Sequence, residues 1–261
     1  MTCIRWSVAL IALVSPLSAQ WINYPVSGTP RTKDGKPNPA APAPRLRGKP
    51  DFSGLWHTAN NLPSQGSGDL PSSPQMHDIG AGFKEPIPYQ SWALEAMKRR
   101  GVKDDHYLNC IVPGGPAMHM LPLMKKFVQT PGLLLILNEY DVNYRQIFLD
   151  GRPLPDDPQP AWNGYSVGKW EGDTLVVQSL GYRDDQTLDQ KGSPLTSAAR
   201  VTERFRRRSF GSLEIQVTVD DPKAYTRPFT VLLKQDLAPD TDLLDAPCTD
   251  NEKDVPHMLN Q

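Results

Sequence analysis

The chain has 261 residues, of which 27 are proline and 19 are glycine. This share of chain-breaking residues argues against long uninterrupted helices, but it lies below the roughly 25–30% typical of wholly disordered chains. Basic residues number 28 and acidic residues 29, so the net charge of −1 provides no basic field for nucleic acid or for an anionic membrane. Hydrophobic residues make up 38%, which is enough for one core with appendages.

The N-terminus has the pattern of a secretory signal. Arg5 precedes an apolar run from Trp6 to Val14, and small residues follow up to Ala19. We therefore expect residues 1–19 to be a signal peptide and the mature protein to be periplasmic or extracellular. The run is too short to span a bilayer, so no membrane insertion of the mature chain is expected. The alternative is an amphipathic first helix of the fold.

Residues 20–50 are expected to form a long proline-rich arm. Seven of the thirty residues from 21 to 50 are proline. Proline fixes φ and lacks a backbone donor, so the arm should run extended, either as a linker or as a strap on the domain. The folded domain is expected to occupy residues 51–261, with a C-terminal tail over residues 238–261.

One short helix is predicted over residues 91–100. The Ser91 hydroxyl can cap its first turn, Trp92 and Leu94 supply apolar positions, and Gly101 stops it after a basic last turn.

The chain from about residue 127 to residue 237 alternates between apolar runs and turn residues, as hairpin strands do. We predict seven strands, over residues 133–139, 144–149, 165–170, 174–180, 201–207, 212–220 and 229–237. The fold class is therefore mainly β, an antiparallel meander that forms a lipocalin-like barrel. A β-sandwich is the alternative.

Removal of the signal peptide leaves two cysteines, Cys110 and Cys248. Two cysteines in an exported chain predict one disulfide, and two buried free thiols are the alternative. The five histidines show no metal-site spacing, and HExxH and CxxC motifs are absent from the sequence. We therefore expect no metal and no other cofactor.

Strand alternation places one acidic and one basic residue on apolar faces. Glu203 shares its face with Val201 and Phe205, and Arg145 shares its face with Ile147. A carboxylate on an apolar face must be paired, or its pKa rises and it becomes a candidate general acid or base. We predict that Arg145 and Glu203 meet inside the barrel as a ligand anchor or an acid–base dyad. The alternatives are a buried structural ion pair, or that the opposite face is the inner one.

Aromatic residues gather on the same strands and supply candidate ligand-binding walls. The candidates are Tyr140, Tyr144, Tyr165 and Trp170, and filling of the core is the alternative role for them. A second catalytic candidate is His257, which has acidic neighbours and can titrate near neutral pH. Anchoring of the tail is the alternative role of His257.

Four segments carry a resemblance. Gly48–Trp56, Gly168–Val177, Thr202–Phe205 and Asn251–Asp254 together look like a family of uncharacterised secreted bacterial proteins. That resemblance implies export and carries no established activity. In its hairpin pattern the chain is also similar to lipocalin-like barrels, whose Gly-x-Trp signal is approximated by Gly54–Leu55–Trp56.

These features favour an exported β-barrel that binds a small molecule in a partly apolar, aromatic-lined pocket. One alternative is a secreted acid–base enzyme, a lyase, isomerase or hydrolase acting on a small organic or sugar-like substrate, with Glu203 or His257 as the base. Another is a structural or interaction module whose arm docks a partner. No nucleic-acid partner is expected, and no feature of the sequence indicates an oligomeric state.

Overall fold

The structure is a computed structural model that describes residues 24–59, 76–106 and 109–248. The expected signal peptide over residues 1–19 lies outside these residues.

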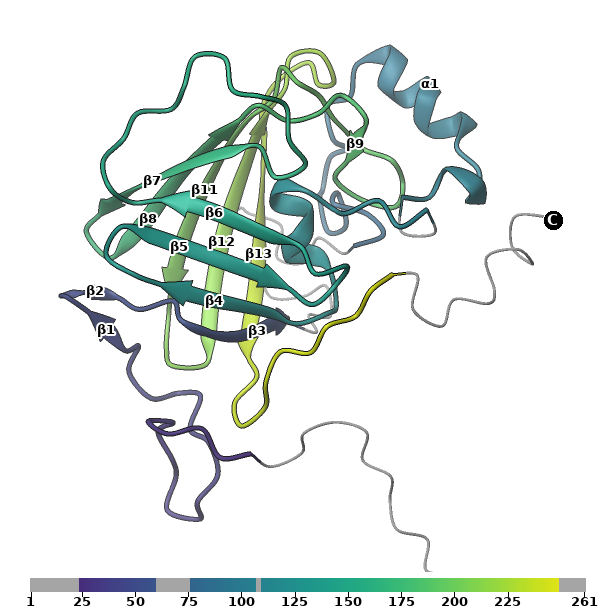
Figure 1. Cartoon of the computed structure of the whole chain (residues 1–261). Coiled ribbons are helices and arrows are strands. Elements are labelled where there is room, and N and C mark those ends of the chain that lie inside the picture. Colours follow the sequence, from purple (N-terminus) through teal and green to yellow (C-terminus); the bar gives the residue numbers. More distant parts are fainter. Residues whose placement is uncertain (1–23, 60–75, 107–108, 249–261) are drawn as a thin grey trace, which may run out of the picture.

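Nine strands close into one barrel (Figure 1). In chain order they are β3 (Gly54–Thr58), β4 (Lys125–Gln129), β5 (Leu133–Asn138), β6 (Tyr144–Phe148), β7 (Tyr165–Glu171), β8 (Thr174–Leu180), β11 (Arg200–Arg207), β12 (Ser212–Asp220) and β13 (Phe229–Leu237). Each strand pairs with the next in this order, and β13 pairs with β3 to complete the ring. The predicted barrel is confirmed, and the sandwich alternative is wrong.

The strand pairing differs from the predicted meander in two ways. The first is that β3 and β4 belong to the barrel, although neither is among the seven predicted strands. The second is that β6 and β7 run parallel, with Ile147 opposite Ser166. Antiparallel neighbouring strands can be joined by a tight turn, whereas parallel neighbours need a connection that returns the chain to the end of the barrel where the first strand began. Residues 149–164 form this long connection between β6 and β7.

Two segments outside the strands fill the barrel. Phe52 enters at the end where β3 begins, and its ring stacks on Trp170 at 5.5 Å between centroids and lies 6.1 Å from Phe205. The 3₁₀ helix η2 (Gly115–Met120) lies at the end where β3 finishes, and all six of its residues are buried. Both contributions make the barrel interior a packed core.

The predicted helix is present as α1 (Ser91–Arg99), outside the barrel (Figure 1). The N-cap residue is Gln90 rather than Ser91, and no side chain caps the first turn, so the expected capping by Ser91 is wrong. The short 3₁₀ helix η1 (Val102–Asp104) follows it. None of the described helices is long and apolar enough to cross a membrane.

The described part of the arm lies on the barrel as a strap. Its hairpin of β1 (Arg45–Leu46) and β2 (Lys49–Pro50) contacts the β7–β8 turn. Arg45 donates two hydrogen bonds to Asp173, and Lys49 Nζ donates to the Gly172 carbonyl at 3.1 Å. A second small hairpin, β9 (Gln186–Thr187) with β10 (Pro194–Leu195), lies outside the barrel.

Candidate functional site

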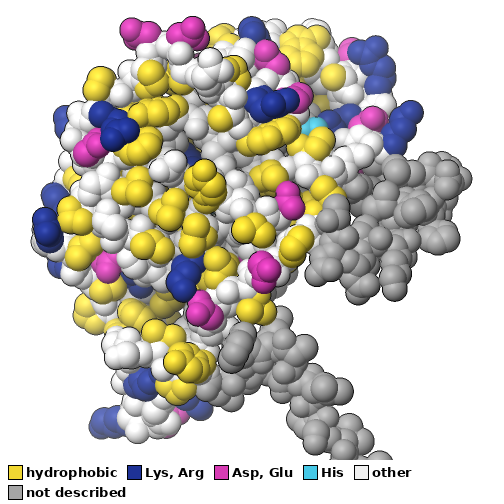
Figure 2. All heavy atoms as spheres, in the orientation of Figure 1, with side chains coloured by type: hydrophobic (Ala, Val, Ile, Leu, Met, Phe, Trp, Pro, Cys, Tyr) yellow, Lys and Arg dark blue, Asp and Glu magenta, His cyan; other side chains and the backbone are white. Residues whose placement is uncertain are grey.

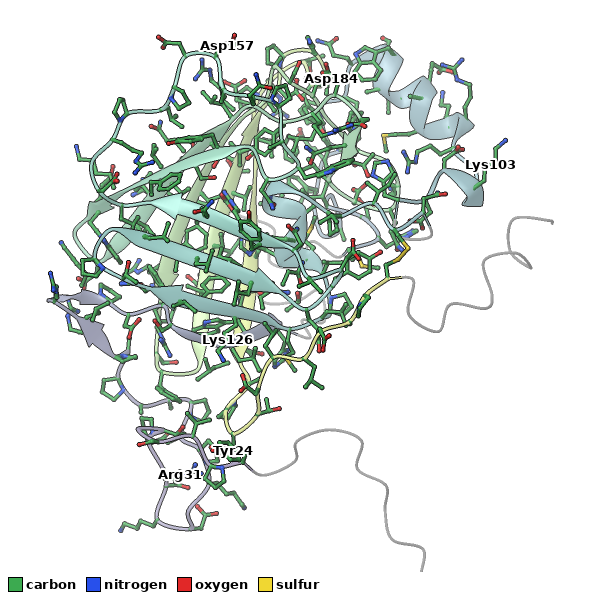
Figure 3. The ribbon with its side chains drawn as sticks, viewed as in Figure 1. Tyr24, Arg31, Lys103, Lys126, Asp157 and Asp184 are labelled. Atoms are coloured by element: carbon green, nitrogen blue, oxygen red, sulfur yellow. A yellow bond between two sulfur atoms is a disulfide. The ribbon has the colours of Figure 1, made fainter. Side chains whose placement is uncertain are left out.

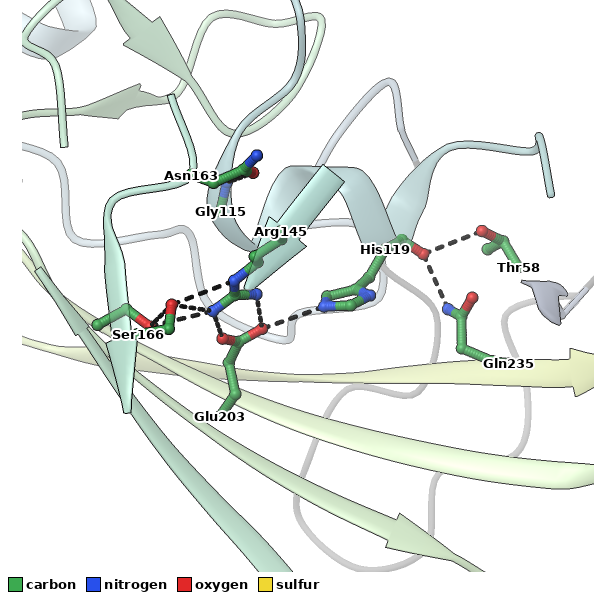
Figure 4. A network of polar contacts seen from close by, with 9 residues as sticks. Thr58, Gly115, His119, Arg145, Asn163, Ser166, Glu203 and Gln235 are labelled. Carbon is green, nitrogen blue, oxygen red and sulfur yellow. Dashed lines mark hydrogen bonds and ion pairs between the residues drawn. The ribbon is translucent and has the colours of Figure 1, made fainter. Parts of the chain in front are cut away.

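Arg145 and Glu203 meet inside the barrel (Figure 4). Arg145 Nη1 donates to Glu203 Oε1 at 3.0 Å, and Nη2 donates to Oε2. The side chain of Arg145 is 1% exposed and that of Glu203 is 0% exposed. Alternation along β6 and β11 predicts this placement, because the buried positions of β11 are Val201, Glu203, Phe205 and Arg207.

Two serines complete the surroundings of the guanidinium. Ser166 Oγ accepts from Arg145 Nε at 3.3 Å and from Nη2 at 3.2 Å, and Ser179 Oγ accepts from Nη2 at 3.0 Å. The two hydroxyls are also 2.8 Å apart. A buried ion pair is tolerated only when its remaining polar atoms are satisfied in this way.

His119 of η2 is the third ionisable side chain at this centre. Its Nε2 lies 3.2 Å from Glu203 Oε1, and its ring is edge-on to Phe205 at 5.7 Å. Its backbone carbonyl accepts from Thr58 Oγ1 at 2.9 Å and from Gln235 Nε2 at 2.8 Å. Within the described part of the chain, neither ring nitrogen has a well-aligned hydrogen bond. No sequence spacing links His119 to Glu203, so sequence reasoning did not find the contact.

The charges at this centre follow from burial and from the pair itself. Burial alone would raise the pKa of Glu203, but attraction to Arg145 and contact with His119 outweigh it, so this pKa lies well below its usual range. Burial, together with the nearby charges of Arg145 and Lys125, lowers the pKa of His119 below its usual value, although Glu203 acts to raise it. Burial opposes the charge on Arg145 as well, yet Glu203 holds the pKa of Arg145 above its usual value. The centre therefore holds an ionised pair beside a neutral imidazole.

Lys125 is a second buried cation near η2. Its Nζ donates to the Leu121 carbonyl at 2.7 Å, to the Leu123 carbonyl at 3.0 Å and to Thr58 Oγ1 at 3.3 Å. Burial lowers the pKa of Lys125 to about 7. These bonds join the chain that leaves η2 to β3 and β4.

We expect the free energy of unfolding to rise with pH through Lys125, by at most about 1.4 kcal/mol per pH unit. Between the native pKa of about 7 and the ordinary value of 10.5, the unfolded chain binds a proton that the native lysine has released. The free energy would be measured by urea unfolding at three pH values across this interval. Lys125→Met should remove this slope, whereas the exposed neighbour variant Lys126→Met should keep it. Equal slopes in wild type and Lys125→Met would contradict the assignment.

The predicted aromatic walls do not assemble around Arg145. Tyr144 is 57% exposed on the outer face, and the hydroxyl of Tyr165 accepts from Arg152 at 3.2 Å on the same side. Adjacent residues of a strand point to opposite faces, so Tyr144 cannot share an inner wall with Arg145. Of the four candidates, only Trp170 packs into the core, against Phe52.

The remaining predicted residues lie near the β5–β6 turn or outside the described chain. Cys110 and Cys248 form the expected disulfide, with 5.5 Å between their Cα atoms. The Tyr140 hydroxyl donates to Cys248 Sγ at 3.2 Å. Tyr140 therefore lies against the disulfide rather than in a pocket wall. His257 lies outside the described residues.

A cleft that the sequence does not predict lies between the arm and the barrel. Its volume is about 380 Å³. The side chains of Val26, Leu55, Phe210 and Leu237 line it, together with Lys126 and the segment that follows β13. We call it the arm cleft. Tyr24 and Arg31 lie in the arm below the barrel, and Lys126 lies above them on β4 (Figure 3).

Two ion pairs stand at the arm cleft. Arg31 Nη2 lies 2.6 Å from Asp240 Oδ1, and Lys126 Nζ lies 2.7 Å from Asp242 Oδ1. The floor depends on Gly54, whose φ is +145° and at which a Cβ atom would lie 2.6 Å from Leu237 Cδ1. Only glycine fits this close approach without strain.

No family model, curated protein or solved structure matches this chain. The likeness to secreted bacterial proteins and to lipocalin-like barrels therefore stays a prediction. Among residues 24–59, 76–106 and 109–248, no three His, Cys, Asp or Glu side chains lie together as a metal site requires.

Proposed function

We propose that this protein is an exported β-barrel that binds a small, partly apolar molecule in the arm cleft. The observation that carries the proposal is the arm cleft itself, a hollow of about 380 Å³ with apolar walls between two parts of the chain. This volume is within the range of ligand sites, which combine apolar walls with a few polar groups. Export is supported by the signal pattern and by the disulfide.

The chemistry of the lining indicates the class of ligand. Leu55, Phe210 and Leu237 offer contact to an apolar body. Lys126 and Asp242 offer one charge of each sign at the same cleft, so a polar or charged end group can exchange for either partner. We infer an elongated or flat organic molecule with a polar end.

The buried centre supports a structural role rather than binding or acid–base catalysis. Arg145 and Glu203 are sealed from solvent, and each satisfies the other. A general base needs a free lone pair and a pKa near the working pH. The Glu203 carboxylate has Arg145 on both oxygens and a lowered pKa. The arm cleft therefore has more support as the functional site than the pair has.

The test uses anilinonaphthalene sulfonate, a fluorescent probe with an apolar body and an anionic end. Titration into the whole mature protein should show saturable binding, and Val26→Asp should weaken it by about tenfold because a charge then borders the apolar wall. Val142→Asp is the matched control, since Val142 is also an exposed valine but lies in the β5–β6 turn. Equal weakening in both variants, or none in Val26→Asp, would place the probe elsewhere and contradict the proposal.

A further inference from the structure

The outer side of strands β4 to β7 is largely apolar. Figure 2 shows hydrophobic side chains gathered over these strands. Alternation turns eight apolar or aromatic residues outward there, namely Val128, Leu133, Leu135, Leu137, Tyr144, Phe148, Tyr165 and Val167, together with the polar residues Lys126, Gln146, Lys169 and Glu171. We call this surface the outer apolar face. Its apolar residues are separate from the arm cleft, because none of them lines that cleft.

These side chains form one continuous surface. Across β5 and β6, Leu137 is opposite Tyr144 and Leu133 is opposite Phe148. Across β6 and β7, the rings of Phe148 and Tyr165 are 5.3 Å apart. Directly paired residues on one face of a sheet lie within contact distance. Gln146, opposite Leu135, is a polar side chain within this surface, and the apolar contacts continue on both sides of it.

The strands on the opposite side of the barrel, β11 and β12, have a polar outer face. The outward positions of β11 are Arg200, Thr202, Arg204 and Arg206, and those of β12 are Ser212, Glu214, Gln216, Thr218 and Asp220. A sheet face in water carries polar residues of this kind. On β5 both faces are apolar, because Leu134 and Ile136 fill the core while Leu133, Leu135 and Leu137 point outward. A contiguous apolar patch on the outside of a sheet is a candidate interaction site.

We propose that the outer apolar face is where two copies of this chain pack together. The nine strands close into a ring, so a partner cannot add a strand to an edge of this barrel and must pack face to face. Two sheets packed in this manner align their strands within about 30°. A two-fold axis through the face buries the same side chains of both copies against each other.

The charges around the outer apolar face favour a second copy over other partners. Arg152 pairs with Asp150 at 2.6 Å and lies 3.8 Å over the Phe148 ring. On another side, Lys126 pairs with Asp242 at 2.7 Å. A border that carries both acidic and basic groups can pair with the same border of a second copy across a two-fold axis. Nucleic acid or an anionic bilayer would instead require an excess of basic groups. The net charge of −1 also leaves little repulsion between two copies.

The test is the oligomeric state of the full mature protein by analytical ultracentrifugation over roughly 1–100 μM. Wild type should be a dimer. Leu135→Lys should raise the dissociation constant by at least about 100-fold, because the dimer would bury two unpaired ammonium groups. Gln216→Lys on the outside of β12 is the matched control and should remain a dimer. Circular dichroism confirms that each variant is folded.

Tyr144→Lys gives an independent variant if Leu135→Lys does not fold, because Tyr144 is mostly exposed in the single chain. It should also yield monomers. A monomeric wild-type protein overturns the proposal. This holds also if the monomer sediments together with phosphatidylcholine vesicles, because the face would then bind a lipid surface. Dimers that persist in both lysine variants overturn it as well. These results are independent of probe binding in the arm cleft.

Discussion

Replacement of Arg145 by methionine is expected to lower the free energy of unfolding by about 3–5 kcal/mol, which is the usual loss when one partner of a buried ion pair is removed. Glu203 would remain in the core, 0% exposed and without its counter-charge. Ser166 and Ser179 would each lose a donor as well. Urea unfolding followed by circular dichroism measures the loss.

The neighbouring variant Arg204→Met is the matched control. Arg204 lies beside Glu203 in the chain, but it pairs with Glu171 on the barrel surface, where the two side chains are 40% and 54% exposed. An exposed pair of this kind contributes about 0–1 kcal/mol. Equal losses in the two arginine variants would show that the buried pair is not a stabilising contact.

The double variant Arg145→Met/Glu203→Leu separates the ion pair from the space it fills. Removing both charges leaves no buried ion without a partner, so this variant should be more stable than Arg145→Met alone. The difference between the double variant and the summed single variants gives the coupling energy of the pair. A double variant as unstable as the sum would mean that Arg145 and Glu203 act independently.

Replacement of Phe52 by alanine should lower the free energy of unfolding by about 3–5 kcal/mol, the range for loss of a fully buried aromatic side chain. Phe52 is completely buried and stacks on Trp170. Its backbone is held on both sides, since its N–H donates to Gln129 Oε1 at 2.9 Å and its carbonyl accepts from Trp56 Nε1 at 2.9 Å. The main chain therefore cannot easily move to fill the space. Thermal and urea unfolding measure the effect.

The control at the same position is Phe52→Leu. Leucine keeps most of the apolar volume, so its loss should be less than half that of alanine. A loss below about 1 kcal/mol for Phe52→Ala would show that the ring does not close this end of the barrel.

Phe52 also explains why the segments Gly48–Trp56 and Gly168–Val177 lie together. Lys49 reaches the Gly172 carbonyl, Phe52 stacks on Trp170, and Arg207 donates to the Asp51 carbonyl. The Gly48–Trp56 segment thus joins the arm to the β7–β8 hairpin and to β11. These contacts give both segments a structural role at the end of the barrel where β3 begins.

Local sequence determined seven of the nine barrel strands and the faces of those strands. Period-two alternation identified β11 and β12, and it placed Arg145 and Glu203 in the core, because the side-chain direction of a strand follows from its backbone alone. The same rule, applied to Tyr144 beside Arg145, would have placed that ring outside. Helix α1 could be found for a similar reason, since its stop and its basic last turn are local.

Only the tertiary structure decided which distant residues meet. His119 reaches Glu203 from a helix that plugs the barrel, and the arm cleft brings Val26 to Phe210 and Leu237. The parallel pairing of β6 with β7 depends on the path of a long connection. Contacts of this kind form because closing the barrel brings together segments that are far apart in the chain, and no local spacing of residue types records that closure.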